Sequence, residues 1–270
     1  MRNTEVVNEM FRRFSIFLKS VIHWCSGVFG YVLCIGVLFS LRVEAVEPDW
    51  HEYDELLAQY VSPGESAGVE LNQVDYAGLA RDPKFKNVVD MIAVFPLAQL
   101  STADETLAFY INVYNVLALN MVVQNFPVQS IKDVGSFFRP VWKRPAGKVG
   151  GRQVTLHAVE HKILRTLNEP RIHFAIVCAS VSCPDLRLES YVSDRLDMQL
   201  DDQCRRFLNN PNKGLRETTR KVEVSKIFKW FEQDFEPHGG IANFIRRYRE
   251  LPGSSRIDPA IDYNWSLNGR

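Results

Sequence analysis

The stretch "TLAFYINVYNVLALNMVVQNF", residues 106–126, is apolar on nearly every side of a helical projection and decides how the rest of the chain must fold. Thr102-Ala103-Asp104-Glu105 immediately before it forms a capping box, in which the Thr and Glu side chains satisfy free backbone N–H groups at a helix start. Pro127 ends the pattern. Because a helix that is apolar all round must be buried, the sequence predicts a central helix around which the other elements pack.

Two of the amide side chains in this apolar stretch, those of Asn112 and Asn115, need an explanation. Asn112 and Asn115 are three positions apart and therefore lie on one face of the predicted helix. A buried amide without a hydrogen-bond partner costs free energy, so both side chains must bond something. They either tie the helix to the backbone of a neighbouring loop or line a polar, substrate-binding pocket.

The surrounding sequence predicts shorter elements. Caps, prolines and helical spacing indicate helices near residues 50–61, 75–80, 82–94 and 155–167, a hairpin around Gly150-Gly151, and a last helix over 239–251. Residues 171–179, "RIHFAIVCA", predict a strand, a further helix is expected from Pro184, and residues 221–225 predict a strand that leads into a helix capped by Ser225. We expect one helix-rich α+β domain with a small β-sheet over residues 47–270.

The first 45 residues are typical of an export signal. Arg12, Arg13 and Lys19 precede an almost uncharged run, residues 21–41, and Val43-Glu44-Ala45 provides a small-residue cleavage pattern. The run is also about long enough to span a bilayer, which takes roughly 20 residues of helix. Residues 1–45 are therefore a signal peptide or an uncleaved signal anchor. In both cases the domain is expected outside the cytoplasm, either periplasmic or secreted, with membrane contact only through this N-terminal helix.

Charge and cysteine content narrow the function further. The chain has 32 Lys and Arg against 32 Asp and Glu, and a near-neutral domain lacks the basic surface that nucleic-acid binding requires. Removal of the signal leaves three cysteines: Cys178, Cys183 and Cys204. In an oxidising compartment, an odd number allows at most one internal bridge and one leftover thiol.

The sequence resembles the domain-of-unknown-function family numbered 547. The segments that carry the resemblance lie within residues 50–268 and are "YDELLAQYV", "VDYAGL", "LAFYINVYNVLAL", "VTLHAVEHKILR", "RIHFAIVCASVSCPDLR", "SKIFKWFEQDF" and "IDYNWSLN". The family pattern implies roles for Asn112, Asn115, Glu160, His161, Cys178 and Cys183. The chain departs from it at Tyr110, where tryptophan is usual, and at Ala179, where glycine is common.

A thiol nucleophile is the first chemical hypothesis. If Cys183 lies at the start of the helix expected from Pro184, the helix dipole lowers the pKa of its thiol and favours the thiolate. His161 on the preceding helix would then be the general base, with Glu160, Asn112 or Asn115 orienting it. The expected activity is that of a hydrolase or acyl transferase acting on a small molecule or a peptide.

The competing hypothesis is a non-catalytic envelope interaction module. Cys178 and Cys183 are close enough in sequence to form a disulfide if the intervening residues turn back, and an oxidised Cys183 cannot attack a substrate. Arg187 is a further candidate for binding an anionic substrate group or for an ion pair, and Trp265 could return over the central helix as an apolar lid.

A metal site and a cofactor are not predicted. His157, Glu160 and His161 spell H-x-x-E-H, which places two histidines on one helical face, but no third ligand accompanies the string. The sequence predicts no oligomeric state.

Overall fold

The structure is a computed structural model that describes residues 47–136, 138–251 and 256–270, so the predicted signal or anchor segment, residues 1–45, lies outside the described residues. At its centre is α5 (Ala103–Val123), which begins at the predicted capping box: Thr102 accepts from the N–H of Glu105, whose side chain accepts from the N–H of Thr102. Among the described helices, α5 alone is long and apolar enough to cross a membrane, but 83% of its most apolar 18-residue segment is buried inside the fold. It is the central helix that the sequence predicts.

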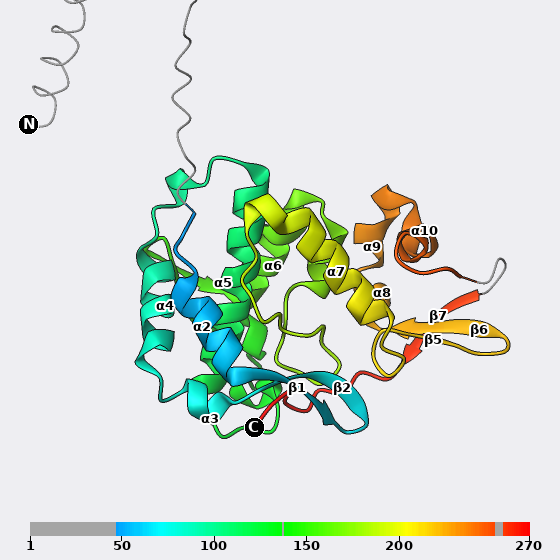
Figure 1. The fold of residues 1–270 in the computed structure, drawn as a ribbon, viewed down its shortest axis with the longest axis horizontal. Coiled ribbons are helices and arrows are strands. Elements are labelled where there is room, and N and C mark those ends of the chain that lie inside the picture. Colours follow the sequence, from blue (N-terminus) through cyan, green and yellow to red (C-terminus); the bar gives the residue numbers. More distant parts are fainter. Residues whose placement is uncertain (1–46, 137, 252–255) are drawn as a thin grey trace, which may run out of the picture. The chain divides into compact units, whose positions relative to one another are not determined.

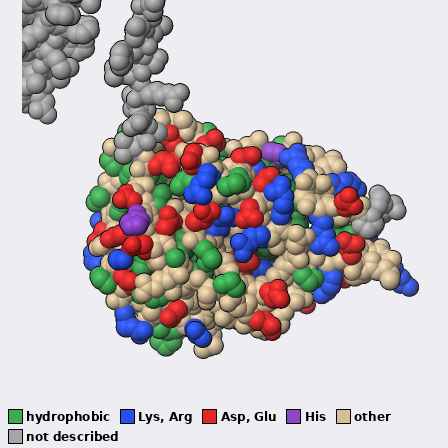
Figure 2. Space-filling view, viewed as in Figure 1, with side chains coloured by type: hydrophobic (Ala, Val, Ile, Leu, Met, Phe, Trp, Pro, Cys, Tyr) green, Lys and Arg blue, Asp and Glu red, His purple; other side chains and the backbone are tan. Residues whose placement is uncertain are grey.

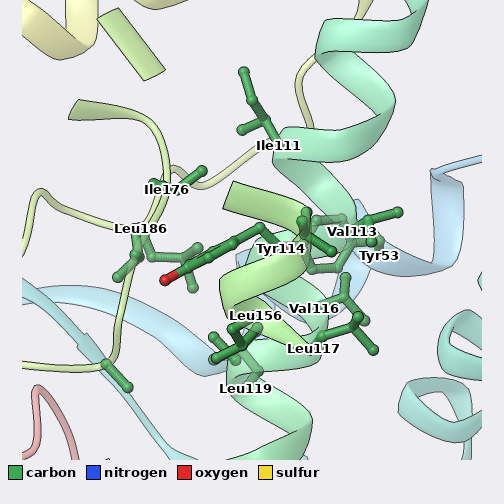
Figure 3. Packing of buried hydrophobic residues seen from close by; sticks show 14 of the residues in the cluster. Tyr53, Ile111, Val113, Tyr114, Val116, Leu117, Leu119, Leu156, Ile176 and Leu186 are labelled. Carbon is green, nitrogen blue, oxygen red and sulfur yellow. The ribbon is translucent and has the colours of Figure 1, made fainter. Parts of the chain in front are cut away.

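Side chains of α5 pack against several surrounding segments. Figure 3 shows Val113, Tyr114 and Leu117 close to side chains from an N-terminal helix, from the helix that follows the hairpin and from the loop beyond it. The helices of the fold, drawn in Figure 1, are α2 (His51–Tyr60), α3 (Tyr76–Leu79), α4 (Pro83–Val94), α5, α6 (Leu156–Lys162), α7 (Leu196–Leu208), α8 (Ile227–Trp230), α9 (Glu232–Phe235) and α10 (Gly240–Arg246).

Within the described residues, three small sheets complete the α+β fold. Hairpins pair β1 (Val61–Ser66) with β2 (Val69–Val74) and β3 (Pro145–Val149) with β4 (Arg152–Thr155). The third sheet has the order β5-β6-β7, with β5 (Leu215–Glu217) antiparallel and β7 (Arg256–Ile261) parallel to β6 (Lys221–Ser225). The helix-rich α+β class is therefore confirmed, although the β-structure is divided among three sheets.

The predictions for residues 171–192 are wrong. Residues Pro170–Phe174 form a short 3-10 helix, η5, and the chain from Ala175 to Val192 is a loop rather than a strand followed by a helix. Its apolar residues are buried all the same, because side chains and the C-terminal segment bond the loop backbone in place of a neighbouring strand. The next helix, α7, begins only at Leu196.

The buried side chains in the described part of the chain form two apolar clusters. The larger surrounds α5, whereas the smaller joins Phe174 with α7, α8, α10 and the third sheet. Tyr263, in the C-terminal segment, packs against both clusters. Outside them, Lys and Arg side chains alternate with Asp and Glu over the face shown in Figure 2.

Candidate functional site

A cavity of about 380 Å³ lies where the two apolar clusters meet. Aromatic rings form much of its wall, and carboxyl, imidazole and sulfur atoms gather in it. The first part of the lining comes from Tyr114 in α5, from Pro140, Trp142 and Lys143, and from His157, Glu160 and His161 in α6. The rest comes from η5 and the loop after it (His173, Ile176, Cys178, Cys183 and Pro184), from the region of α8 (Ile227, Trp230 and Phe231) and from the C-terminal segment (Tyr263 and Trp265). A volume of this order suits a small organic molecule.

A disulfide between Cys178 and Cys183 forms part of the wall. Their Cα atoms are 6.2 Å apart because the intervening residues turn back, with the N–H of Cys183 donating to the carbonyl oxygen of Ser180 at 3.0 Å. Val181 and Ser182 are fixed by backbone hydrogen bonds to Ser266 and Asn264. Cys183 is therefore bridged, buried and in a loop. The prediction that it sits at a helix N-terminus is wrong, and no helix dipole acts on it.

The hydroxyl of Tyr263 lies against the bridge. Its oxygen is 3.1 Å from Sγ of Cys183 and 3.3 Å from Sγ of Cys178. Burial raises the pKa of Tyr263 well above its usual range, so the hydroxyl keeps its proton. Because the bridged sulfurs carry no hydrogen, this hydroxyl is the donor, and the two sulfurs share its single hydrogen.

Glu160 brings a carboxyl group to the cavity from the buried side of α6. Burial raises its pKa to about 7, and the positive charge of Arg165 opposes this only in part. The hydroxyl of Tyr114 lies 3.5 Å from its Oε2. Near neutral pH this carboxyl therefore exchanges easily between its charged and uncharged forms, as a general acid or base must.

His161, one position further along α6, is held in one tautomer. Nη1 of Arg165 lies 2.8 Å from Nδ1 of His161, and a guanidinium can only donate. Nδ1 must therefore accept, and the neutral ring carries its proton on Nε2. Burial, with the neighbouring His157 and Arg165, lowers the pKa of His161 to about 4. In this arrangement His161 presents an N–H donor, whereas the predicted role of general base needs a free lone pair.

Asp234 anchors this side of the cavity and was not predicted from the sequence. It accepts two hydrogen bonds from Arg165, both at 2.6 Å, and one from Nε2 of His173 at 2.7 Å. These contacts hold its pKa below its ordinary value although burial opposes the shift. The sequence signal that could have pointed to it is His173 within the apolar run 172–177, because a buried histidine needs a polar partner.

The H-x-x-E-H string does not assemble a metal site. The rings of His157 and His161 lie 4.3 Å apart between centroids. Over the described parts of the chain, however, no three His, Cys, Asp or Glu side chains are placed to hold a metal ion.

Asn112 and Asn115 bond loop backbone. Asn112 exchanges two hydrogen bonds with the backbone of Tyr191, at 2.8 and 2.9 Å. Asn115 donates to the carbonyl oxygen of Ala175 at 3.0 Å and accepts from the N–H of Val177 at 2.8 Å. Neither amide is among the residues that line the cavity.

Arg187 also lies outside the cavity lining and is part of an ion-pair cluster. It contacts Asp202 at 2.5 Å and Glu189 at 2.7 Å. Its guanidinium is thereby occupied by side chains of this chain.

Trp265 lines the cavity together with two further tryptophans that the sequence did not single out, Trp142 and Trp230. Its ring lies 5.5 Å from that of Trp142 and 5.8 Å from that of Trp230, between centroids. These tryptophans come from segments more than 30 positions apart, so only the fold brings them together. The lining of the cavity thus combines an aromatic wall with ionisable groups.

These features define a helix-rich α+β domain with an aromatic cavity, a buried carboxyl beside a half-buried imidazole, and a disulfide in the cavity wall. The family model described as "Protein of unknown function, DUF547" matches residues 97–208. This match to part of the chain confirms the resemblance found in the sequence. The match contains Glu160, His161 and both bridged cysteines, but ends before Tyr263 and Trp265. Comparison with curated proteins and with solved structures finds no match.

Proposed function

We propose that this domain is an extracytoplasmic module that binds a small, largely apolar organic molecule in the cavity. The observation that carries the proposal is the pairing of an aromatic wall, made by Trp142, Trp230 and Trp265, with a small polar end at Glu160 and His161. Ligand sites in proteins combine mostly apolar walls with a few polar groups that fix orientation.

The polar end favours an uncharged ligand group. Glu160 accepts hydrogen bonds when ionised and donates when protonated, and both forms are populated near pH 7. His161 is neutral and offers Nε2–H as a donor. An amide or a hydroxyl can bond both groups, whereas a carboxylate in the same place would be repelled by ionised Glu160. Lys143 also lines the cavity, but it is exposed, so solvent screens its attraction for a carboxylate.

The bridge supports binding over attack by a thiolate. A hydrolase or acyl transferase that uses Cys183 needs the Cys178–Cys183 bond reduced, and it needs a base other than the Nε2–H tautomer of His161. An oxidised bridge also suits the export that residues 1–45 predict, because disulfides persist outside the cytoplasm.

Calorimetric titration with indole-3-acetamide tests this function. The indole matches the aromatic wall and the amide matches the polar end, so we expect saturable binding at neutral pH and weaker binding of indole-3-acetate. Trp230→Ala should weaken binding about tenfold, since an aromatic pair contributes about 1 kcal/mol beyond its buried area. Trp230 is 45% exposed, so its removal spares the core. Trp50→Phe, in the apolar cluster around α5, is the matched control. Equal affinity in all three proteins would contradict the proposal.

A further inference from the structure

The two sulfurs of the Cys178–Cys183 bridge are not equivalent. Both residues line the cavity, but Cys183 is only 2% exposed whereas Cys178 is half-buried. In thiol–disulfide exchange, the sulfur that is attacked is chosen largely by access. A thiol that enters the cavity therefore meets Cys178 first.

Hydrogen bonding distinguishes the sulfurs in the same sense. Sγ of Cys183 accepts from the backbone N–H of Cys178 at 3.0 Å and lies 3.1 Å from the hydroxyl of Tyr263. Sγ of Cys178 lies slightly farther from that hydroxyl, at 3.3 Å, and the hydroxyl of Ser180, 3.6 Å away, donates to the carbonyl oxygen of Cys178 at 3.4 Å. Donors aimed at a sulfur stabilise it as a thiolate and make it the better leaving group. Cys183 is thus the better leaving group of the two cysteines.

We propose that the bridge is a thiol–disulfide exchange site, in which a small apolar thiol bound in the cavity attacks Cys178 and expels Cys183 as a thiolate. The proposal rests on the proposed function, because it makes a thiol one class of ligand of the same cavity. It gives Tyr263 a specific role as the side-chain donor to the departing sulfur.

The exchange proceeds in two balanced steps. The thiolate of the ligand forms a bond to Sγ of Cys178, the Cys178–Cys183 bond breaks, and its electron pair goes to Sγ of Cys183. The thiolate of a second molecule of the same ligand then attacks the ligand sulfur of this mixed disulfide and expels Cys178 as a thiolate. Two thiols are oxidised to one ligand disulfide, the bridge is reduced to two cysteines, and the two protons released by the thiols are taken up by Cys178 and Cys183.

The same residues are positioned by the fold rather than by the bridge alone. The loop that carries both cysteines is bonded to the C-terminal segment through Val181–Ser266, Ser182–Asn264 and Ala179–Asn268 backbone contacts. Reduction therefore leaves Cys183 beside its two donors instead of releasing the loop.

Trapping the mixed disulfide tests the proposal. The oxidised full chain with Cys25→Ser and Cys34→Ser is treated with phenylmethanethiol, quenched with acid, alkylated with N-ethylmaleimide at controlled pH and mapped by peptide mass spectrometry. We expect the benzyl adduct on Cys178 and the maleimide on Cys183, in about tenfold excess over the reverse pattern. An even distribution, or adducts on Cys183, would overturn the assignment. The double variant Cys178→Ser/Cys183→Ser in the same background measures any signal from buried Cys204.

Rates separate a cavity reaction from simple surface reduction. Phenylmethanethiol should open the bridge at least about tenfold faster than 2-mercaptoethanol, whose polar chain gains nothing from the aromatic wall. Tyr263→Phe should slow exchange about tenfold, the effect of one hydrogen bond to a charged atom. Tyr248→Phe, which removes a hydroxyl bonded to Asp201 outside the cavity lining, should change nothing.

Binding of indole-3-acetamide to the same preparation distinguishes the two possible failures. If the amide binds but the native bridge resists phenylmethanethiol, the exchange is wrong and the proposed function stands. If the amide does not bind and both thiols react equally, the cavity is not a ligand site and both proposals fail.

Discussion

Nε2 of His173 donates a hydrogen bond to Oδ2 of Asp234 across 2.7 Å, which leaves Nδ1 of the same ring as a buried lone pair without a partner among the described residues. The ring is stacked on Phe231 at 4.0 Å between centroids, so it cannot turn freely to exchange its nitrogens. His161 is fixed in the same tautomer by a different cause, the donation from Arg165 to its Nδ1. Two imidazoles in the cavity lining are thus set by the Arg165–Asp234 pair.

Histidine NMR should show both rings neutral at pH 7 with the proton on Nε2. Burial is the main cause that lowers the pKa of each ring. His161 should begin to take up a proton only near pH 4, whereas an unfolded histidine does so near 6.5. The folded state then binds fewer protons than the unfolded state between these values, so this ring reduces stability as the pH falls through that range. A proton on Nδ1 of His161 would contradict the Arg165 contact.

Replacement of Glu160 by glutamine should change how stability depends on pH. The unfolded carboxyl loses its proton near pH 4.5 and the folded one near 7, so the folded wild type binds more protons in between. Its free energy of unfolding therefore falls as the pH rises through this range, by about 3 kcal/mol. Glu160→Gln should lack this fall and exceed the wild type at pH 8 by more than at pH 5. Urea unfolding of both proteins at the two pH values measures the difference, and equal differences would contradict the raised pKa.

Removal of the Asn115 amide should cost stability without loss of ligand affinity. Asn115→Ala leaves the carbonyl oxygen of Ala175 and the N–H of Val177 buried and unpaired, a cost of roughly 2–4 kcal/mol. Thermal or urea unfolding measures this loss. Titration of the variant with indole-3-acetamide below its melting range should give the wild-type affinity. A folded variant that binds less would mean that the amide serves the ligand directly.

Glycine at position 179 should stabilise the fold. Ala179 has a φ of +59°, in the left-handed region that costs a residue with a side chain about 1 kcal/mol or more. Ala179→Gly should therefore raise the free energy of unfolding by about 1 kcal/mol, and it restores the residue that is common in the resembled family. Ala175→Gly is the matched control, because its φ of −106° is ordinary and the change should destabilise. Loss of stability in both variants would refute the strain argument.

Apart from the helix expected from Pro184, local signals in the sequence predicted the helices well. Asp75, Asp82, Thr102 and Thr155 each accept the backbone hydrogen bond expected of a helix cap, and the hairpin turns at Gly150-Gly151. The run 171–179 failed because its apolar residues suit a strand and a buried loop equally well. Hydrogen bonds from residues distant in sequence, such as the Asn115 side chain and the backbone of Asn268, determine that this run is a loop.

The same limit governs the site. Glu160, His161, Cys178, Cys183 and Trp265 could be singled out by residue type, and they line one cavity. Their chemistry could not be predicted, since it depends on contacts across long separations: Arg165 with Asp234, and Tyr263 with the bridge. The Cys183-Pro184 pair is typical of a helix start in sequence, and only the fold shows that the sulfur is bridged and contacts Tyr263.

The last residues of the chain complete the cavity. Tyr263 and Trp265 line it, while the backbone of Leu267, Asn268 and Arg270 bonds Gln129, Ala179 and Val74. Any molecule that contacts those two rings binds only the docked form of this tail, so by mass action it stabilises docking by RT ln(1 + [L]/Kd). A ligand bound in the cavity should therefore slow hydrogen exchange at the backbone amides of Leu267, Asn268 and Arg270, which hold this segment in place.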